Sequence, residues 1–260
     1  MKSKEKFVVT SDITEWFVIG LDDTSDNTDE ESQTTQDLLM TMSTQLSEDG
    51  WGLFEGLTVH PLFGSNKIQS GSSNSCYAVK LWTTRSALDL EDELVSQIRS
   101  TASSNSDPGL AMLSRHSDMP HILAFGRRTQ TELMRSDWAQ TFSTEANVTM
   151  RSLGVKRNGC IGALAACGLR AGGDELARFR TIPGLEDMRG HHRAGDIRDK
   201  TQLQHLLNAD DEEIDMDDTI DLGDGLPVLK PHLESHEPVI RLHQDPSNRR
   251  LWIPDPIFFR

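Results

Sequence analysis

The stretch Phe17-Val18-Ile19-Gly20-Leu21, followed at once by Asp22-Asp23-Thr24, decides how this chain is interpreted. The residues before Asp22 are apolar and rich in strand formers, so they predict a short buried β-strand. Ligands of open α/β sheets bind at the carboxyl ends of strands, and two adjacent carboxylates there are costly without a neutralising cation. A hydrated Mg²⁺, held by one or two carboxylates and by substrate phosphates, would supply that charge. The alternative interpretation is a solvated, aspartate-rich turn.

The rest of the chain alternates predicted strands with predicted helices, which favours an α/β fold, with α+β as the alternative. A polar loop over 22–36 precedes a helix that ends at Gly50. An amphipathic helix is expected over 88–102, and a glycine- and alanine-rich helix over 159–171. Further helical segments are expected within 119–153, and strands at 51–62, 76–82, 110–113, 177–182, 226–230, 239–242 and 250–253.

The length of 260 residues allows one large or two small domains. We expect a core over 1–208, an acidic linker over 209–225 and a short β-rich segment over 226–260. The acids of 209–225 lack the spacing, central glycine and terminal glutamate of an EF-hand loop, so we interpret them as a solvated linker rather than a calcium site.

The formal net charge of −15 argues against a nucleic-acid partner, because such proteins usually present a basic face. The arginines between Arg178 and Arg198 are interpreted as ordinary surface charge. No segment approaches the roughly 20 apolar residues that span a bilayer, and no apolar leader follows the charged N-terminus, so we expect no membrane partner. The chain has three cysteines without a CxxC pair, which is typical of a reducing cytoplasm and argues against a zinc ribbon.

Three further stretches carry residue types that suit a nucleotide. Thr34-Thr35 opens a helix, where a cap and a phosphate contact are compatible. Gly71-Ser72-Ser73-Asn74-Ser75 would let a backbone approach a ligand, although a flexible hairpin loop is an equal alternative. Asn158-Gly159-Cys160-Ile161-Gly162 leads into a small-residue helix, which either exposes N–H groups to an anion or simply packs tightly. It matches neither the P-loop nor the GxGxxG pattern. The histidines, such as His191, have no ligand-like partners.

In this order, the pieces resemble the catalytic part of the archaeal tRNA-isoleucine agmatinylcytidine synthetase family and its bacterial relatives. The matching stretches are Val18–Thr24, Thr34-Thr35, Ser70–Asn74, Asp107-Pro108-Gly109 and Gly159–Gly168. Departures are Ser25 in place of the last aspartate of the family's first motif, Gln33 in place of a cysteine, and no cysteines for the family's zinc ribbon.

The resemblance implies a kinase-like domain joined to a ferredoxin-like domain, with ATP and Mg²⁺ as cofactors. Asp22 and Asp23 would serve the metal and the phosphates, and Thr34 would lie near the transferred phosphoryl group. The nucleotide would contact residues of the remaining motif stretches: Thr24, Thr35, Ser72, Ser73, Asn74, Asn158, Gly159 and Gly162.

We therefore predict an ATP- and Mg²⁺-dependent enzyme, a ligase or kinase-like phosphotransferase, that activates a small molecule or nucleobase by phosphoryl transfer. Its partners would be the nucleotide and a small-molecule acceptor that the sequence does not identify. One alternative is a non-catalytic nucleotide-binding or regulatory protein. Another is a tRNA cytidine-modifying enzyme that works with a separate RNA-binding subunit.

Overall fold

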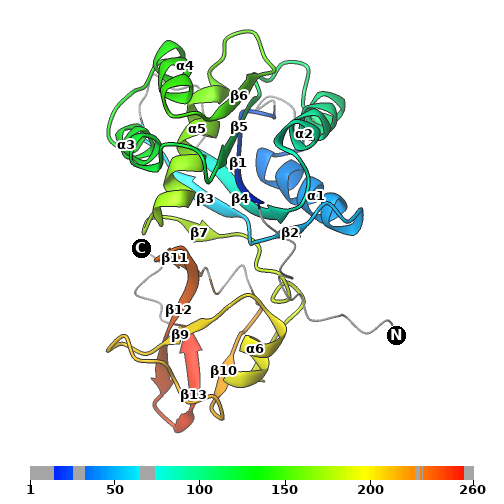
Figure 1. The fold of residues 1–260 in the computed structure, drawn as a ribbon. Helices are drawn as coiled ribbons and strands as arrows, with labels where there is room; N and C mark the ends of the chain where they lie inside the picture. The colour runs from blue at the N-terminus through cyan, green and yellow to red at the C-terminus, as the bar shows by residue number, and fades with distance from the viewer. Residues whose placement is uncertain (1–14, 26–32, 65–73, 226–228, 230, 255–260) are drawn as a thin grey trace.

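A computed structural model describes residues 15–25, 33–64, 74–225, 229 and 231–254. These residues form two bodies, one above the other in Figure 1. The first body, residues 15–176, contains strands in the order β6-β5-β1-β4-β3 between two layers of helices. Beyond β3 the strand order continues through β7 (Arg178–Phe179) into the second body. Its strands are β1 (Glu15–Asp22), β2 (Leu53–Phe54), β3 (Thr58–Pro61), β4 (Ser75–Thr83), β5 (Gly109–Ser114) and β6 (Thr149–Ser152), and its helices are α1 (Thr35–Glu48), α2 (Ala87–Thr101), α3 (Met119–Thr129), α4 (Ser136–Glu145) and α5 (Gly159–Gly172).

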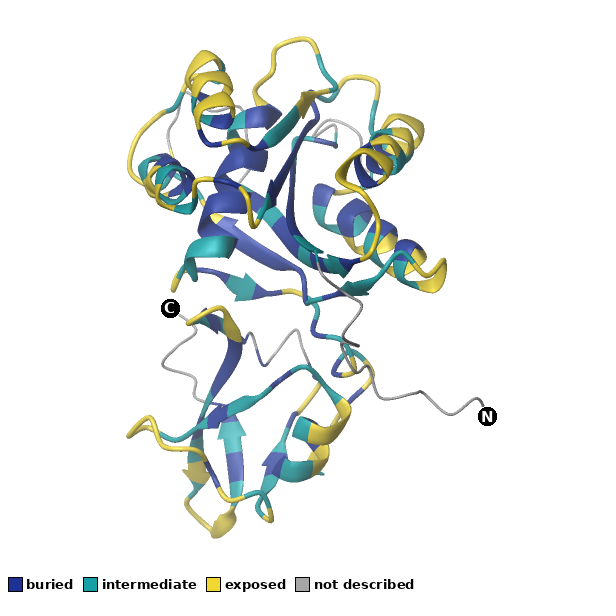
Figure 2. Ribbon diagram, viewed as in Figure 1, coloured by how far each residue is buried: buried dark blue, intermediate teal, exposed yellow. Residues whose placement is uncertain are grey.

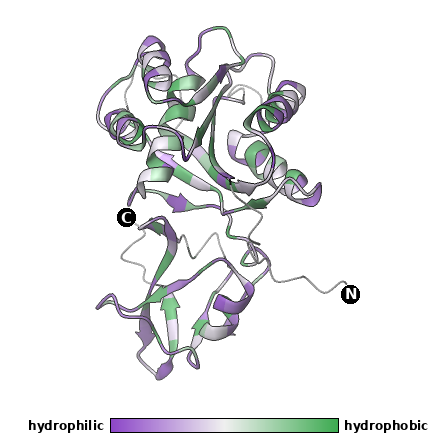
Figure 3. Ribbon diagram, in the orientation of Figure 1, coloured by the Kyte–Doolittle hydropathy of each residue, from purple (hydrophilic) through white to green (hydrophobic). Residues whose placement is uncertain are grey.

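Strand β1 lies in the middle of this sheet and serves both layers. Phe17, Ile19 and Leu21 pack with α1 and α2 in one apolar cluster. Val18 points to the other face, because successive side chains of a strand alternate, and it joins the cluster formed with α3, α4 and α5. Figure 2 shows the middle of this strand buried, and Figure 3 shows apolar colouring on it and on α5.

Helix α5 packs directly on the sheet because small residues line it. The ideal Cβ position at Gly20 would lie 2.1 Å from the carbonyl oxygen of Ala163, so only glycine allows this approach of strand and helix. Gly173, at φ 68°, ends the helix as a left-handed cap. The predicted helix over 159–171 is thereby confirmed, together with α1, α2, β4 and β5 near their expected bounds.

The sheet of the first body is antiparallel at every described pairing. Strand β1 pairs with β4 and with β5 in antiparallel registers, and β3, β6 and β7 join in the same sense. The mixed α/β class is confirmed, although this sheet is not of the open, mostly parallel kind in which ligands bind at the carboxyl ends of the strands. The carboxyl end of β1 instead lies beside the amino ends of β4 and β5, and sequence periodicity does not encode the direction of a partner strand.

The second body, residues 177–254, has its own apolar core, from Ala177 to Trp252. Strand β7 connects the two bodies, because it pairs with β3 on one side and with β11 on the other. The elements of this body are β7 (Arg178–Phe179), β8 (His191–Arg193), α6 (Ala194–Lys200), β9 (His205–Leu207), β10 (Thr219–Asp221), β11 (His232–Glu234), β12 (Glu237–Asp245) and β13 (Asn248–Pro254).

The acidic segment 209–225 contributes to this second core. Ile220 of β10 is buried, and β10 pairs with β13 and with β8. Leu222 is also fully buried, while the neighbouring acids remain on the surface. We therefore propose that the boundary between units falls near Ala177 rather than within 209–225.

Among the described residues, no helix is long and apolar enough to cross a membrane.

Candidate functional site

The candidate site lies where β1 ends. Asp22 is the last residue of the strand and pairs with Gly109 of β5, so it sits at the end of a central strand as predicted. Asp23 follows at φ 57°, a left-handed conformation that aspartate tolerates better than most residues. The carbonyl oxygen of Asp23 accepts the N–H of Asp107 at 3.1 Å. The turn after β1 is therefore bonded to the loop that precedes β5.

The two predicted threonine stretches meet at this turn. Thr24 is buried, and both its N–H and its hydroxyl donate to Oγ1 of Thr35, at 3.2 and 3.0 Å. Thr34 caps helix α1, since its Oγ1 accepts the N–H of Asp37 at 3.1 Å. The exposed side chain of Thr34 and the start of α1 thus lie next to the acidic turn.

The first turn of α5 packs against Asp22 and Asp107. An ideal Cβ at Gly162 would lie 1.8 Å from Oδ2 of Asp22, so the Asp22 carboxylate occupies the space that a side chain would need. An ideal Cβ at Gly159 would lie 2.4 Å from the carbonyl oxygen of Asp107. Both glycines are required by close approach, because a side chain at either position would meet Asp22 or the backbone of Asp107.

Asp107 is a functional candidate that the site prediction missed. Its carboxylate accepts the backbone N–H groups of Lys156, Arg157 and Asn158, at 2.9, 3.1 and 2.6 Å. Arg157 adopts φ 65°, and the three N–H groups converge on the buried carboxylate. Asp107 thereby shapes the loop that leads into α5. The signal in the sequence is its place in Asp107-Pro108-Gly109, which by itself predicts only a turn.

The electrostatics of the turn make negative charge unfavourable. Burial, reinforced by the nearby Asp23, raises the pKa of Asp22 to about 8, against a smaller opposing effect of a backbone hydrogen bond from Asp23. Burial and the charge of Asp107 raise the pKa of Asp23, while Lys156 lowers it. A cation bound between the first two carboxylates would reverse these shifts.

The structure brings together Asp22, Asp23, Thr24, Thr35, Gly159 and Gly162, with Thr34 beside them. Ser72 and Ser73 lie outside the described residues. Asn74 is at the base of the β3–β4 hairpin, where its side-chain amide donates to the carbonyl of Phe63 at 2.9 Å. Asn158 already donates its N–H to Asp107. A nucleotide contact at either asparagine stays a prediction.

A groove of about 300 Å³ lies between α1 and α2, and no described residue of the predicted site lines it. Its lining is largely polar and includes Gln33, Thr41 and Gln97. No group of three His, Cys, Asp or Glu side chains suited to a metal occurs in the described part of the chain. Two carboxylates nevertheless suffice for Mg²⁺, which keeps several waters and takes oxygen ligands from phosphates.

No family model and no curated protein matches this chain. Solved structures do match it. The complex of TiaS with an isoleucine tRNA and ATP has 19% sequence identity and a TM-score of 0.50, and the match covers 60% of this chain and 36% of that one. The complex of TiaS with the same tRNA, AMPCPP and agmatine has 17% identity and a TM-score of 0.50, over 70% of this chain and 43% of that one.

A tRNA fluorescent labeling enzyme also matches, with 18% identity and a TM-score of 0.49, over 59% of this chain and 36% of that one. TiaS is a tRNA agmatidine synthetase. Because the matches cover 36–43% of the other chains, this chain spans less than half the length of these proteins. The resemblance predicted from the motifs is confirmed as a likeness of fold.

Proposed function

We propose that this chain is an ATP- and Mg²⁺-dependent enzyme that activates a small molecule or nucleobase by phosphoryl transfer. The observation that carries the proposal is the Asp22–Gly162 contact, because it places a half-buried carboxyl group, next to a second one, against the first turn of α5. That arrangement suits a metal and the phosphates of a nucleotide together. The likeness of fold to TiaS structures with ATP and AMPCPP supports the choice of nucleotide.

The residues of this chain would divide the work as follows. Asp22 and Asp23 would hold Mg²⁺, which when bound would neutralise the phosphate oxygens. The start of α1, with Thr34 exposed at its cap, would face the transferred phosphoryl group. The acceptor oxygen would form a bond to the γ-phosphorus as the bond from that phosphorus to the bridging oxygen breaks, releasing ADP. Such catalysis depends mainly on positioning and charge neutralisation.

The identity of the acceptor is a second part of the proposal. TiaS is matched in complexes with an isoleucine tRNA, which favours an RNA nucleobase as acceptor over the expectation drawn from net charge. Because the chain covers 36–43% of those TiaS chains, an RNA substrate would need a separate RNA-binding subunit or a further segment. A non-catalytic nucleotide-binding protein remains the alternative, since Ser25 replaces an acid of the resembled motif.

Calorimetry with ATP, with and without Mg²⁺ or EDTA, tests the nucleotide and metal together. We expect binding that requires Mg²⁺ and that Asp23→Asn weakens strongly, whereas His191→Ala has little effect. Radiolabelled ATP with candidate amines and tRNA then separates turnover from binding alone. Equal binding of ATP with and without metal would contradict the proposal.

A further inference from the structure

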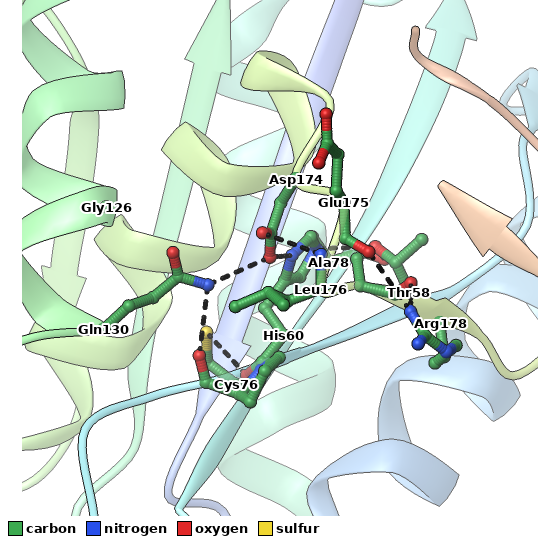
Figure 4. Close-up of polar contacts among 12 residues, drawn as sticks. Thr58, His60, Cys76, Ala78, Gly126, Gln130, Asp174, Glu175, Leu176 and Arg178 are labelled. Atoms are coloured by element: carbon green, nitrogen blue, oxygen red, sulfur yellow. Dashed lines mark hydrogen bonds and ion pairs between the residues drawn. The ribbon is translucent and has the colours of Figure 1, made fainter. Parts of the chain in front are cut away.

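A second polar cluster lies beneath the other end of α5 (Figure 4). His60 of β3 is fully buried, and its Nδ1 lies 3.0 Å from Oδ2 of Asp174, just past the end of α5. Its Nε2 lies 2.9 Å from Oγ1 of Thr58. The side-chain amide of Gln130, which follows α3, donates to the same oxygen of Asp174 at 3.1 Å. A buried polar cluster of this kind is costly unless its members are satisfied.

The hydrogen-bond partners of His60 fix which of its ring nitrogens carries a proton. A carboxylate only accepts, so Nδ1 of His60 carries the proton that faces Asp174. Burial, together with the charge of Arg170, lowers the pKa of His60 despite the opposing effect of Asp174. The ring is then neutral, and its Nε2 accepts from the hydroxyl of Thr58. The Thr58 hydroxyl also lies 3.2 Å from the carbonyl oxygen of Ala78. It would donate its proton to that oxygen only if the His60 ring were charged, because Nε2 would then be a donor.

The hydroxyl, imidazole and carboxylate of Thr58, His60 and Asp174 do not act as a catalytic triad with Thr58 as nucleophile. Thr58 and His60 are both fully buried, so the hydroxyl reaches no substrate in this arrangement. The cluster instead bonds three segments together. Gln130 also donates to the carbonyl of Pro61 at 3.3 Å, and the N–H of Phe63 donates to the carbonyl of Thr129 at 2.8 Å. The base of the β3–β4 hairpin is therefore attached to the ends of both α3 and α5.

The same cluster is connected to Asp22 through the sheet. His60 pairs with Cys76 of β4, and Leu21 of β1 pairs with Tyr77. Continuing that register by one residue places Asp22 opposite Cys76, so His60, Cys76 and Asp22 form one row on the face that α5 covers. Two strand spacings, roughly 10 Å, separate the ends of the row. Cys76 is fully buried and feels the charges of both Asp22 and Asp174, which agrees with this placement.

We propose that Thr58, His60 and Asp174 are positioning residues of the candidate site. By holding β3 to the end of α5, they set how Cys76 of β4 packs between β3 and Asp22, and they fix the base of the hairpin that contains Asn74. Helix α5 then has a fixed contact at each end, Asp22 at its first turn and His60–Asp174 past its last. The inference rests on the proposed function only for the ligand that Asp22 binds. The contacts among Thr58, His60 and Asp174 do not depend on that function.

The experiment compares Asp174→Asn with Asp218→Asn. Asp218 is a matched control, because it accepts the ring N–H of Trp252 at 2.8 Å as Asp174 accepts that of His60, but it lies in the second body. The affinity for ATP with Mg²⁺ is measured by calorimetry at temperatures where circular dichroism shows each variant folded. We expect Asp174→Asn to weaken binding roughly tenfold or more, the usual scale for residues that orient a binding group. Asp218→Asn should lower the melting temperature alone.

Threonine variants separate positioning from general stability. Thr58→Val removes the hydroxyl with little change of shape and should weaken ATP binding, whereas Thr58→Ser keeps the hydroxyl and should restore it. Unchanged affinity in both Asp174→Asn and Thr58→Val would overturn the inference.

Amide hydrogen exchange provides a readout that needs no ATP. Asp174→Asn should speed exchange at residues 21–22 and 75–77, and Asp218→Asn should not. If the wild-type protein binds no ATP, the proposed function fails while faster exchange at these residues still supports the positioning role. If exchange there is unchanged, the positioning role is wrong whatever the ATP result.

Discussion

Two acidic regions of this molecule differ in what surrounds their carboxylates. The turn at Asp22-Asp23, with Asp107 beside it, holds few acids, but burial and mutual repulsion raise the pKa values of Asp22 and Asp23. Segment 209–225 holds many more acids, and its side chains are largely on the surface. Several of them form ion pairs there, such as Asp217 with Arg193 and Asp211 with Arg241.

The number of carboxylates therefore says little about whether a segment binds a ligand. Solvated acids are stabilised by water and by arginine, so they need no ligand. Acids that are packed against a helix start and against one another have unfavourable charge that a bound cation relieves.

The largest effect is expected for Asp23→Asn. Loss of one of the two carboxylates in a partly desolvated site should weaken ATP–Mg²⁺ binding by about 2–3 kcal/mol, roughly 30- to 150-fold. The matched control is Asp217→Asn in the acidic segment, and calorimetry should show its affinity unchanged. Equal losses in the two variants would mean that the acids act only through overall charge.

Asp107→Asn should destabilise the fold by ~2 kcal/mol, because three backbone N–H groups lose an ionised acceptor. Urea unfolding followed by circular dichroism measures this. Asp245 is the comparison, since it also accepts the N–H groups of a turn, those of Ser247 and Asn248, but is not buried. A loss for Asp245→Asn as large as that for Asp107→Asn would contradict the importance of burial.

Gly162→Ala should displace the Asp22 carboxylate, because the added Cβ would occupy its position. We expect a folded protein whose ATP–Mg²⁺ affinity falls about tenfold, or ~1.4 kcal/mol. Gly195→Ala in α6 serves as the control, since the nearest atom to its ideal Cβ is 3.3 Å away. Normal binding by Gly162→Ala would show that the position of Asp22 is unimportant.

The histidines whose pKa values are lowered should make the folded protein less stable at acidic pH. Burial, aided by Arg178 and Arg241, lowers the pKa of His232 from 6.5 to about 4, so the folded protein resists a proton that the unfolded chain takes up. The contribution of His232 to stability should therefore be full above pH 6.5 and fall by about 1–2 kcal/mol toward pH 4, after allowance for partial exposure, whereas the raised pKa values of Asp22 and Asp23 oppose folding as pH rises. His60, whose pKa is also lowered, acts in the same direction.

Denaturant unfolding at several pH values measures this dependence, and His232→Gln should flatten it between pH 6.5 and 4. If His232→Gln keeps the pH profile of the wild-type protein, the loss of stability belongs to other groups.

The smallest effect is expected where acids are solvated. Asp210→Asn and Asp224→Asn should each change the free energy of unfolding by less than ~0.5 kcal/mol, because both side chains are exposed. The same urea experiment tests them. A loss of several times that size would mean that the acidic segment is more than a solvated surface.

Most elements of the first body could be predicted because their signals are local. The apolar run Phe17–Leu21 and the apolar spacing of Leu38, Leu39, Met42 and Leu46 are readable within one strand or a few helical turns. Strand β6, within the stretch expected to be helical, was missed because Thr149–Ser152 is short and only partly buried. The polar strand β10 was hidden within an acidic run whose composition suggests solvent.

The sequence alone contains the residues of the candidate site: a strand followed by two aspartates, a threonine at a predicted helix start, and a glycine- and alanine-rich helix. Tertiary structure alone decided the antiparallel sheet and the role of Asp107, whose carboxylate binds N–H groups about 50 residues further along the chain. It alone also joined His60 to Asp174, 114 residues apart. Periodicity records which face of an element is buried, but it carries no information about which distant segment will lie against that face.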